Sequence, residues 1–582
     1  MMNSRLTNVM FLTVGIGATA VALLWDPIQG HALRFSIYQF VLLLLGLGAI
    51  ALSIPRIQQA LHALLATPTQ MERIALTGLS GFLLTWCIAS LWFPFGWDHG
   101  FFASVGDVIV QGGMPYRDAW EIKGPLPYYL FAAAQWIFGR HMWAIRIMDV
   151  ALLLIACVMM ARMTARITSA SVGRWTSVGF ALWYASLTWF YLSQPDGWVA
   201  LLMLLGVGPL VAQHDRVGPR WLGWCALLIG CCALVKPFYA AFLLVPVVFI
   251  LSAPWPVSRR ARAVVVVGMT AAIPPLLTLA WFAYQGALDA LIEVQFIYNP
   301  QVYSGIGRLR PGPVLDKMFD YLWTGGNEVP GGKIAVLLPA IVFGVYTLWR
   351  TSRQIGLTLA TWLGVALFCV AIQGKFWVYH WIPTFPPLAV LGTFGLWKLS
   401  SSVSSLDRPS PGKVFSLIAA AAFIVQVMVT PAADVGRWLQ LLGGFKTHEA
   451  YYTYHAQWKY VASDEMKAAR YIRERTSNSD GVVIWGNDAT VSFLSGRPNP
   501  TRFVYAMPLT RGGPASFLAD YRREFMKGLS AKPPAYFVVG LPHASSNKEA
   551  VLNDFPELVN FLQSHYRLET QIGFLDLYHF VQ

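Results

Sequence analysis

Charged side chains are scarce in this sequence: they make up 12% of its 582 residues. Soluble domains typically carry about 25%. Hydrophobic residues make up 56% of the chain, and the mean hydropathy is +0.51. So few charges cannot cover the water-exposed surface of a protein this large. The composition therefore excludes a soluble globular protein and indicates a polytopic α-helical membrane protein.

Cysteine is also scarce, and all six cysteines fall within apolar runs. The C-terminal part of the chain, which has a soluble composition, contains none. This distribution excludes a disulfide framework, and no spacing is typical of a zinc site. The C-terminal part also lacks a Gly-rich phosphate loop and a nucleophile elbow. We therefore expect no required cofactor, and no divalent metal is indicated. The six residues are Cys87, Cys157, Cys225, Cys231, Cys232 and Cys369.

No basic patch accompanies the net charge of +14, so we do not expect nucleic acid as a partner. The basic residues instead recur in every second loop between apolar runs. By the positive-inside rule, these loops and the N-terminus are cytoplasmic. The loops carry Arg56 and Arg73; Arg162, Arg166 and Arg174; Arg216 and Arg220; Arg259, Arg260 and Arg262; Arg350 and Arg353; and Lys398, Arg408 and Lys413.

About thirteen apolar stretches are long enough to cross a bilayer, which takes ~20 residues in a helix. The first has no small-residue cleavage pattern after it, so we expect it to be a retained span of an inner or plasma membrane protein. The stretches cover residues 9–25, 36–54, 74–94, 142–161, 174–192, 196–212, 220–235, 238–253, 263–284, 334–349, 355–373, 381–397 and 414–430.

Two domains follow from this pattern: a transmembrane domain over 1–430 and a small extracytoplasmic α/β domain over 431–582. Strands are predicted at 481–486 (GVVIWG) and 535–540 (AYFVVG), alternating with helices near 463–475, 517–529 and 548–563. Ser463 and Asp464 are candidate helix caps. The Gly- and Pro-rich loop 286–333 is expected to be irregular and lid-like.

The loop 95–141 holds the densest cluster of acids, bases and aromatic residues. Asp98 and His99 open an interfacial amphipathic helix, which Gly112, Gly113 and Pro115 end. A second helix begins near Pro125. A helix in the membrane interface with carboxylates at both ends suits the meeting of a polar and a lipid-borne reactant. Between the two helices lie Tyr116, Arg117, Asp118, Glu121 and Lys123.

Each candidate also has a structural interpretation. Asp98 is either an N-cap or a catalytic acid, and Lys123 is either a snorkelling lysine or a phosphate ligand. His99 suits an interfacial aromatic residue. Arg117, Asp118 and Glu121 can form a surface ion network, which is the favoured interpretation for Glu121.

Further polar residues are predicted on the same side of the membrane. Asp196 follows a short turn and is either a cap or a site carboxylate, and Lys236 lies at the tip of a hairpin. A third cluster contains Lys375, Tyr379 and His380, which also suit an aromatic belt. Because all these residues fall on one face, they favour an interfacial active site over a conduction pathway.

The run from Asp98 to Tyr129 (DHGFF…GGMPYRDAWEIKGPLPYY), followed by FGRHMWAIRIMD, resembles the first extracytoplasmic loop of family 39-type membrane glycosyltransferases. This family has the C-type fold and is related to protein O-mannosyltransferases and to the aminoarabinose transferase of lipid A. SQPDGW, LVKP, KFWVYHW, DEMKAARYIRE and SGRPNPTRF fit the family's pattern in order. The resemblance covers nearly the whole chain.

The resemblance implies an enzyme that moves a sugar from a polyprenyl-phosphate carrier to a glycan, lipid or protein acceptor. It assigns the proposed base to Asp98, further acids to Asp118 and Asp196, and the carrier phosphate to Lys123 and Lys236. We expect inversion at the anomeric carbon, with no metal required because the lipid phosphate leaves readily.

One departure from the family concerns the metal question. Many relatives have a second acid where this chain has His99, so a metal-binding or paired-carboxylate role at this point is in doubt. His380 is a further candidate for the phosphate, and His99, Tyr116, Arg117, Lys375 and Tyr379 are other site candidates. A transporter or flippase for a lipid-linked glycan is the alternative function, although the apolar spans are poor in charge apart from Arg146 and Asp149. No internal repeat supports it.

Overall fold

In the computed structural model, the described residues are 70–305, 311–324, 337–401, 411–510, 515–541 and 547–581. The predicted spans 9–25 and 36–54 and the basic residues Arg56 and Arg408 lie outside them. The chain forms two compact units, residues 1–92 and 93–582. The described part of the first unit is helix α4 (Gln70–Ser90), which matches the predicted span 74–94 closely. Everything below concerns the second unit.

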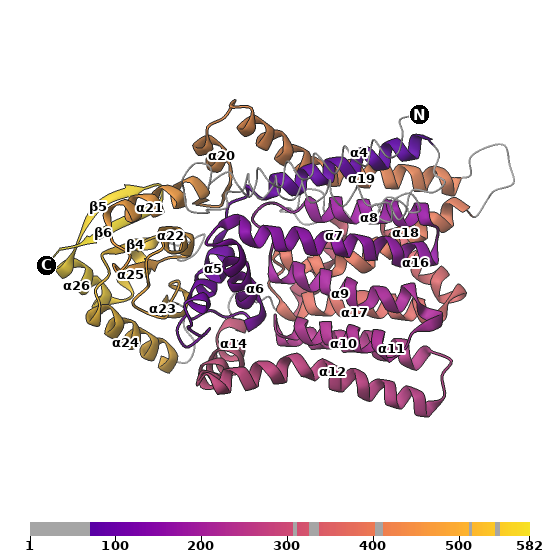
Figure 1. The fold of residues 1–582 in the computed structure, drawn as a ribbon, viewed down its shortest axis with the longest axis horizontal. Helices are drawn as coiled ribbons and strands as arrows, with labels where there is room; N and C mark the ends of the chain where they lie inside the picture. The colour runs from indigo at the N-terminus through magenta and orange to yellow at the C-terminus, as the bar shows by residue number, and fades with distance from the viewer. Residues whose placement is uncertain are drawn as a thin grey trace, which may run out of the picture. The chain divides into compact units, whose positions relative to one another are not determined.

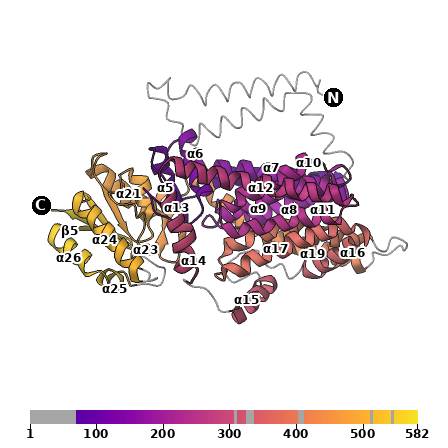
Figure 2. The same cartoon turned by 90° about the horizontal axis from the view of Figure 1, so that it is seen from below.

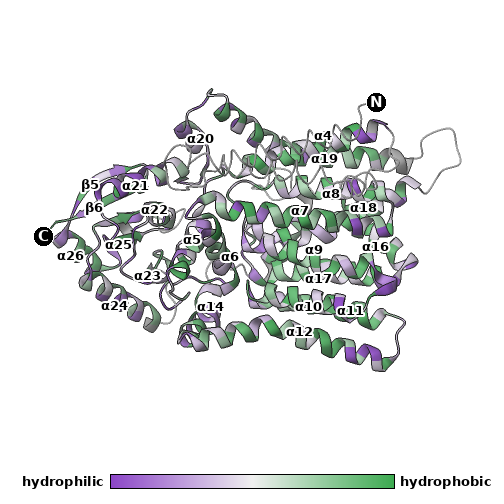
Figure 3. Cartoon of the chain, viewed as in Figure 1, coloured by the Kyte–Doolittle hydropathy of each residue, from purple (hydrophilic) through white to green (hydrophobic). Residues whose placement is uncertain are grey.

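Six described helices are long and apolar enough to cross a membrane: α4, α7 (Met142–Ile167), α9 (Pro195–Ala212), α12 (Val257–Tyr284), α17 (Arg353–Gln373) and α19 (Pro411–Leu442). Shorter helices occupy the other predicted spans: α8 (Ala170–Ala185), α10 (Pro219–Ala233), α11 (Leu244–Ser252), α16 (Leu338–Thr351) and α18 (Phe385–Ser401). Apolar residues dominate these helices (Figure 3). The polytopic helical fold is thus confirmed, while the count of thirteen spans stays a prediction.

Two predicted spans begin with 3₁₀ turns. Residues Pro237–Leu243 form the turn η2 before α11, and Val378–Thr384 form η6 before α18. Proline removes a backbone donor at positions 237 and 383, which weakens regular α-helix there. The 3₁₀ turns shorten α11 and α18, and they place Lys236 and His380 at or next to irregular backbone.

Small residues allow close helix crossings within the bundle. A methyl group on Gly395 would overlap the carbonyl of Ala340, and one on Gly344 would overlap that of Leu391, so α16 and α18 meet backbone to backbone. Gly230 brings α10 against Ala271 of α12 in the same way. Such contacts replace the hydrophobic driving force that is absent between helices in lipid. Figure 1 shows α7, α9, α10 and α12 running along one another.

The loops meet at the two ends as the charge pattern predicts. Arg166 and Asp215 form an ion pair that joins the α7–α8 and α9–α10 connections at one end. Lys236 and Asp196 form another that joins the α10–η2 connection to the start of α9 at the opposite end. The assignment of these ends to the cytoplasmic and extracytoplasmic sides stays a prediction.

The loop 95–141 contains the two predicted helices, α5 (Trp97–Val110) and α6 (Pro125–Phe138). Gly112 ends the first at φ +89°, a conformation that favours glycine. Pro125 opens the second at its first turn. The break between the two helices therefore lies where the glycine and proline residues predicted it.

The expectation of an irregular loop over 286–333 is wrong for much of its described part. Short helices run from α13 (Leu288–Ile292) through the π-helix η3 (Glu293–Tyr298) and α14 (Asn299–Gln301) to η4 (Tyr303–Gly305), and α15 covers Pro311–Thr324. Figure 2 shows α13 leading through this segment to α14. Hydrogen bonds from Gln295 and Asn299 to the first loop supply the order that the local sequence does not predict.

The C-terminal domain has a four-stranded sheet in the order β3-β4-β6-β5. β3 (Val482–Trp485) and β4 (Tyr536–Val539) are parallel, with Val482 opposite Tyr536, and both were predicted. β5 (Tyr566–Ile572) and β6 (Leu575–Phe580) form an antiparallel hairpin that was not predicted. The buried core includes Ile472, Ile484, Val538 and Leu577.

Helices pack with this sheet. α21 (Ala462–Arg475), α22 (Ala489–Ser495), α23 (Met507–Thr510) and α24 (Ala515–Ala531) precede β4, and α20 (His448–Tyr454) leads into the domain. The predicted helix 548–563 is divided at Pro556 into α25 (Lys548–Asn553) and α26 (Pro556–His565). Neither Ser463 nor Asp464 caps α21, whose N-cap is Val461. α19 continues past the predicted span end at 430 to Leu442.

Candidate active site

The N-terminus of α5 is fixed by His99. Gly96 is the N-cap, and its backbone N–H donates to Nδ1 of His99 at 3.0 Å. Nε2 of the same ring donates to the carbonyl of Leu192 at 2.6 Å. These two bonds define a neutral tautomer, and burial with the nearby Arg146 charge lowers the pKa of His99 well below its usual value. His99 is therefore a structural residue that orients α5.

Asp98 lies in the first turn of α5, so the N-cap interpretation is wrong for it. The residue as a whole is partly exposed, while its carboxyl lies buried beside the hydroxyl of Tyr379. Burial raises the pKa of Asp98, and the positive charges of Lys123 and Lys236 oppose this rise. A carboxylate with a raised pKa is a stronger base than an ordinary aspartate.

Lys123 is held rigidly by its backbone. Its carbonyl accepts hydrogen bonds from Tyr116 at 2.7 Å, Tyr128 at 3.0 Å and Gln295 at 2.8 Å. Its N–H donates to Glu121 at 2.7 Å. Four hydrogen bonds to the backbone groups of this one residue leave the start of its side chain little freedom.

The ammonium of Lys123 is available to a ligand. The residue is 7% exposed, and no acceptor within the described residues takes a hydrogen bond from its Nζ. Nζ lies 5.8 Å from the centre of the Tyr303 ring. Burial lowers its pKa, but Tyr303 and the carboxyls of Asp98 and Glu121 together raise the pKa above its usual value. Lys123 is therefore a fixed cation.

Asp196 and Lys236 form a buried ion pair. Nζ of Lys236 lies 2.7 Å and 2.9 Å from the two carboxylate oxygens and donates to Gln373 at 2.6 Å. Asp196 is fully buried at the start of α9 and also accepts from Tyr239. Burial lowers the pKa of Lys236 to about 8, against the opposing effect of Asp196. Asp196 orients the lysine, and both of its carboxylate oxygens are engaged in that pair.

η6 contributes Tyr379 and His380, both buried. Nδ1 of His380 has no hydrogen-bond partner within the part of the chain that the structure describes. Burial, with Lys236, Lys123 and Lys375 nearby, lowers the pKa of His380 well below its usual value, so the ring is neutral. Lys375 donates to the carbonyl of Tyr303 at 3.1 Å. The predicted cluster of Lys375, Tyr379 and His380 therefore lies beside the first loop and the Asp196–Lys236 pair.

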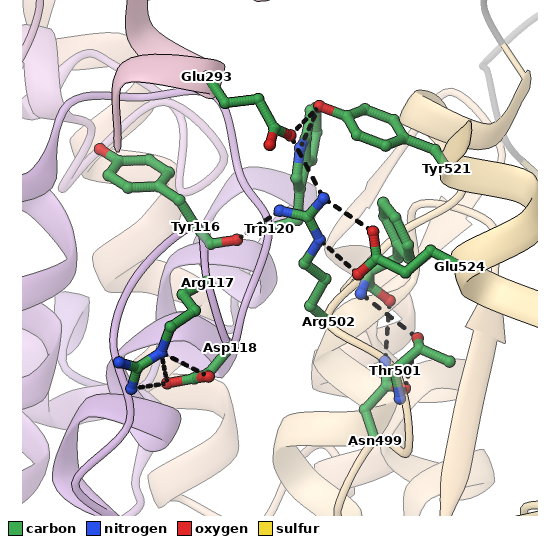
Figure 4. Close-up of polar contacts among 11 residues, drawn as sticks. Tyr116, Arg117, Asp118, Trp120, Glu293, Asn499, Thr501, Arg502, Tyr521 and Glu524 are labelled. Carbon is green, nitrogen blue, oxygen red and sulfur yellow. Dashed lines mark hydrogen bonds and ion pairs between the residues drawn. The ribbon is translucent and has the colours of Figure 1, made fainter. Parts of the chain in front are cut away.

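The structure does not bring Asp118 and Arg117 into this group. Their side chains are 36% and 41% exposed and form an ion pair with each other at 2.7 Å (Figure 4). Asp118 accepts from the N–H of Met114, and Arg117 donates to the carbonyl of Gln285. The charges beside Asp98 and Lys123 are instead those of Lys236, Asp196 and Glu121 and of Asp98 and Lys123 themselves. Both stabilise the turn after Gly113, so the catalytic assignment of Asp118 is replaced by a structural one.

Two residues of this site were not predicted from the sequence. Glu121 was expected on the surface, yet it is 2% exposed and binds Tyr128 and the N–H of Lys123. Tyr303 lies close to the ammonium groups of both Lys123 and Lys375. The EIKG spacing could have suggested the first, because a carboxylate two residues back can accept from a turn amide. Nothing near Tyr303 in the sequence marked it.

Metal binding has no obvious location here. No group of three or more His, Cys, Asp or Glu side chains in the described ranges is arranged to hold an ion. The site consists instead of Asp98, Glu121 and Asp196, the cations Lys123, Lys236 and Lys375, and the neutral groups Tyr303, Tyr379 and His380.

Comparison with known proteins gives a clear result for the fold. No protein-family model matches the sequence, and no curated protein matches it. Among solved structures, ArnT from Cupriavidus metallidurans bound to undecaprenyl phosphate is 16% identical, with a TM-score of 0.54 over 88% of this chain and 98% of that one. The chain has the C-type membrane glycosyltransferase fold. The fold implied by the first-loop resemblance is confirmed.

Two further structures are similar. The apo form of the same ArnT is 15% identical with a TM-score of 0.54, covering 87% of this chain and 97% of that one. The apo oligosaccharyltransferase from Archaeoglobus fulgidus is 12% identical with a TM-score of 0.47, covering 79% and 69%. The similarity to ArnT covers nearly the full length of that protein and most of this chain.

Proposed function

We propose that this protein transfers a sugar from a polyprenyl-phosphate carrier to a hydroxyl acceptor on the extracytoplasmic face of the membrane, with inversion at the anomeric carbon. The observation that carries the proposal is the convergence of Asp98 with Lys123 and Lys236 at one end of the helix bundle. Asp98 and Lys123 come from the first loop, and Lys236 comes from the connection between α10 and η2. The similar ArnT is solved bound to undecaprenyl phosphate, which supports this class of carrier.

Asp98 is the proposed general base. It takes the proton from the acceptor hydroxyl while the hydroxyl oxygen attacks the anomeric carbon on the face opposite the phosphate. The bond between the anomeric carbon and the phosphate oxygen breaks, and its electron pair leaves with the phosphate. Tyr379, which donates to Asp98, orients the carboxylate. A positioned base of this kind contributes ~10²–10⁴-fold to the rate.

The leaving phosphate needs positive charge and hydrogen-bond donors. Lys123 supplies a fixed ammonium with no competing acceptor among the described residues, and Lys236 supplies a second one oriented by Asp196. Neutral His380 adds an available ring nitrogen beside both. Preorganised charges of this kind stabilise an anion as it develops and spend no energy on reorganisation. The reaction therefore requires no metal.

The acceptor approaches from the side of the C-terminal domain. That domain contacts the first loop directly: the N–H of Trp120 donates to the carbonyl of Arg502 at 2.6 Å, and Tyr505 donates to Glu121 at 3.4 Å. A glycan, lipid or protein hydroxyl presented by this domain would reach Asp98 from water. The donor chain would enter from the bilayer.

A flippase or transporter is the alternative, and it would need mobile polar groups within the bundle. The two charged residues that the sequence places near the end of a span, Arg146 and Asp149, are instead fixed by hydrogen bonds. Arg146 donates to the carbonyls of Leu192, Pro94 and Trp189, and Asp149 accepts from Tyr184. These bonds hold the connections in place, which favours a static scaffold beneath an interfacial site.

The test compares Asp98→Asn with Asp118→Asn in purified protein supplied with a panel of polyprenyl-phosphate sugars. We expect Asp98→Asn to lower transfer by ~10²–10⁴-fold. Asp118→Asn, the matched control from the same loop, should keep transfer close to wild type. Full transfer by Asp98→Asn would remove the assignment of the base. Transport of the intact carrier without transfer would favour the alternative.

A further inference from the structure

Arg502 lies in a rigid turn of the C-terminal domain between α22 and α23. Oδ1 of Asn499 accepts from both the N–H and the hydroxyl of Thr501, at 2.9 Å each (Figure 4). This is an Asx-type turn, which fixes the backbone just before Arg502. The arginine side chain is 12% exposed and lies between Glu524 of its own domain and the first loop (Figure 4).

The guanidinium group joins three parts of the chain. It donates to the carbonyl of Tyr116 in the first loop at 3.0 Å and to Glu293 of the π-helix at 3.3 Å. It also pairs with Glu524 of α24 at 2.8 Å. Tyr521 donates to Glu293 at 2.6 Å and reinforces the same junction. The planar fork of arginine suits several partners at once, whereas lysine offers a single point charge.

Both segments that Arg502 contacts also hold Lys123. Tyr116 donates its hydroxyl to the Lys123 carbonyl, and η3 carries Gln295, which donates to the same carbonyl at 2.8 Å. Asn299, directly after η3, donates to the carbonyl of residue 122 at 2.7 Å. A π-helix contains an extra residue per turn and occurs frequently at functional sites. Arg502 thus contacts two of the supports of Lys123 or their element: Tyr116 itself, and the π-helix that carries Gln295.

We infer that Arg502 is a positioning residue of the donor site, through which the C-terminal domain sets the place of the Lys123 ammonium. The inference rests on the proposed function of Lys123 as a phosphate ligand. With Arg502 in place, the first loop, the π-helix and the C-terminal domain form one frame around residues 122 and 123. Without Arg502, the first loop and the π-helix are no longer joined to the C-terminal domain at this point. The Lys123 ammonium then shifts and no longer binds the phosphate.

The test is a double-mutant cycle read by binding, with full-length purified protein and farnesyl phosphate as the probe. The variants are Arg502→Ala, Lys123→Met and the combination. Arg522→Ala is the matched control, because Arg522 is similarly buried and its hydrogen bonds among the described residues go to Asp554 and Leu509 of its own domain. Arg502→Lys tests how much of the effect the charge alone restores.

We expect Arg502→Ala to raise the Kd for farnesyl phosphate about tenfold in the wild-type background and less than about twofold when Lys123 is already Met, because coupled residues are not additive. Arg502→Lys should restore only part of the loss, and Arg522→Ala should leave the Kd unchanged. Equal losses in both backgrounds, or an equal loss in Arg522→Ala, would overturn the inference.

Two further results of the cycle bear on the inference: those of a replacement variant and of Lys123→Met alone. If Arg502→Ala does not fold, Glu293→Gln replaces it in the same cycle and is expected to give the same non-additivity with a smaller loss. Additive losses for that variant would also overturn the inference. An unchanged Kd for Lys123→Met alone would refute the phosphate role of Lys123, which is a failure of the proposed function, and the inference would fail with it.

Discussion

Lys123 and Lys236 both lie near Asp98 with little exposure to solvent. The structure predicts that replacing Lys236 lowers mainly the folding stability, whereas replacing Lys123 lowers mainly the rate of transfer. Nζ of Lys236 pairs with Asp196, which is fully buried, and with Gln373. Lys236→Met leaves that carboxylate without its counter-charge. Breaking a buried ion pair in this way costs ~3–5 kcal/mol of folding free energy.

Lys123→Met should behave differently. No hydrogen bond from Nζ to a described residue is lost, and the methionine side chain fills a similar volume. The carboxyls of Asp98 and Glu121 lose a favourable charge, and both can respond by taking up a proton. We expect a stability loss of ~1 kcal/mol, smaller than for Lys236→Met, because no hydrogen bond from Nζ to a described residue is broken. Transfer should fall ~10–100-fold, since a charged hydrogen bond to phosphate is worth ~1.5–3 kcal/mol.

The assay measures denaturant midpoints by tryptophan fluorescence in detergent, alongside initial transfer rates for both variants. The expected pattern is a large loss of stability for Lys236→Met and a loss of transfer with little loss of stability for Lys123→Met. Lys123→Met with full transfer and a midpoint as low as that of Lys236→Met would refute this reasoning. Lys123 would then be a structural residue.

Other predictions follow from the site and the fold. Because burial raises the pKa of Asp98, transfer should decline as the pH falls through a value above that of an ordinary aspartate, and Lys123→Met should move this decline to higher pH in a pH–rate profile. Transfer should also decline as the pH rises through about 8, where Lys236 loses its proton. Burial raises the pKa of Asp488 from 3.8 to about 6, so its contribution to stability is present below pH 3.8 and is lost as the pH rises through 6; Asp488→Asn should flatten the melting temperature over that range, and an unchanged slope would contradict the assignment. Gly395→Ala should lower stability by ~1–3 kcal/mol in thermal unfolding, because its methyl group would overlap the Ala340 carbonyl, whereas Gly364→Ala, with open space around it, should not.

Much of the site was predictable from local chemistry. Proline and glycine punctuation located α5 and α6, and the alternation of basic loops placed Asp98, Asp196 and Lys236 at one end of the bundle. These features depend on short-range rules of backbone geometry and on the bilayer, which act within a few residues or along one span.

The supports of the site could not be predicted in this way. Glu121 is buried because Tyr128 binds it, and Arg502 reaches Tyr116 across 386 positions of the sequence. Spacing carries no information about such tertiary contacts. The β5–β6 hairpin was missed for a related reason: exposed polar residues such as Arg567 and Glu569 interrupt its apolar pattern on an edge strand.

The most direct test of the account is an experimental structure of the protein with undecaprenyl phosphate. We predict phosphate density within hydrogen-bond reach of Nζ of Lys123, with Asp98 facing the position that the anomeric carbon would take and Nδ1 of His380 turned toward the phosphate. A phosphate held elsewhere on the protein, with the ammonium of Lys123 still lacking a ligand, would contradict the account.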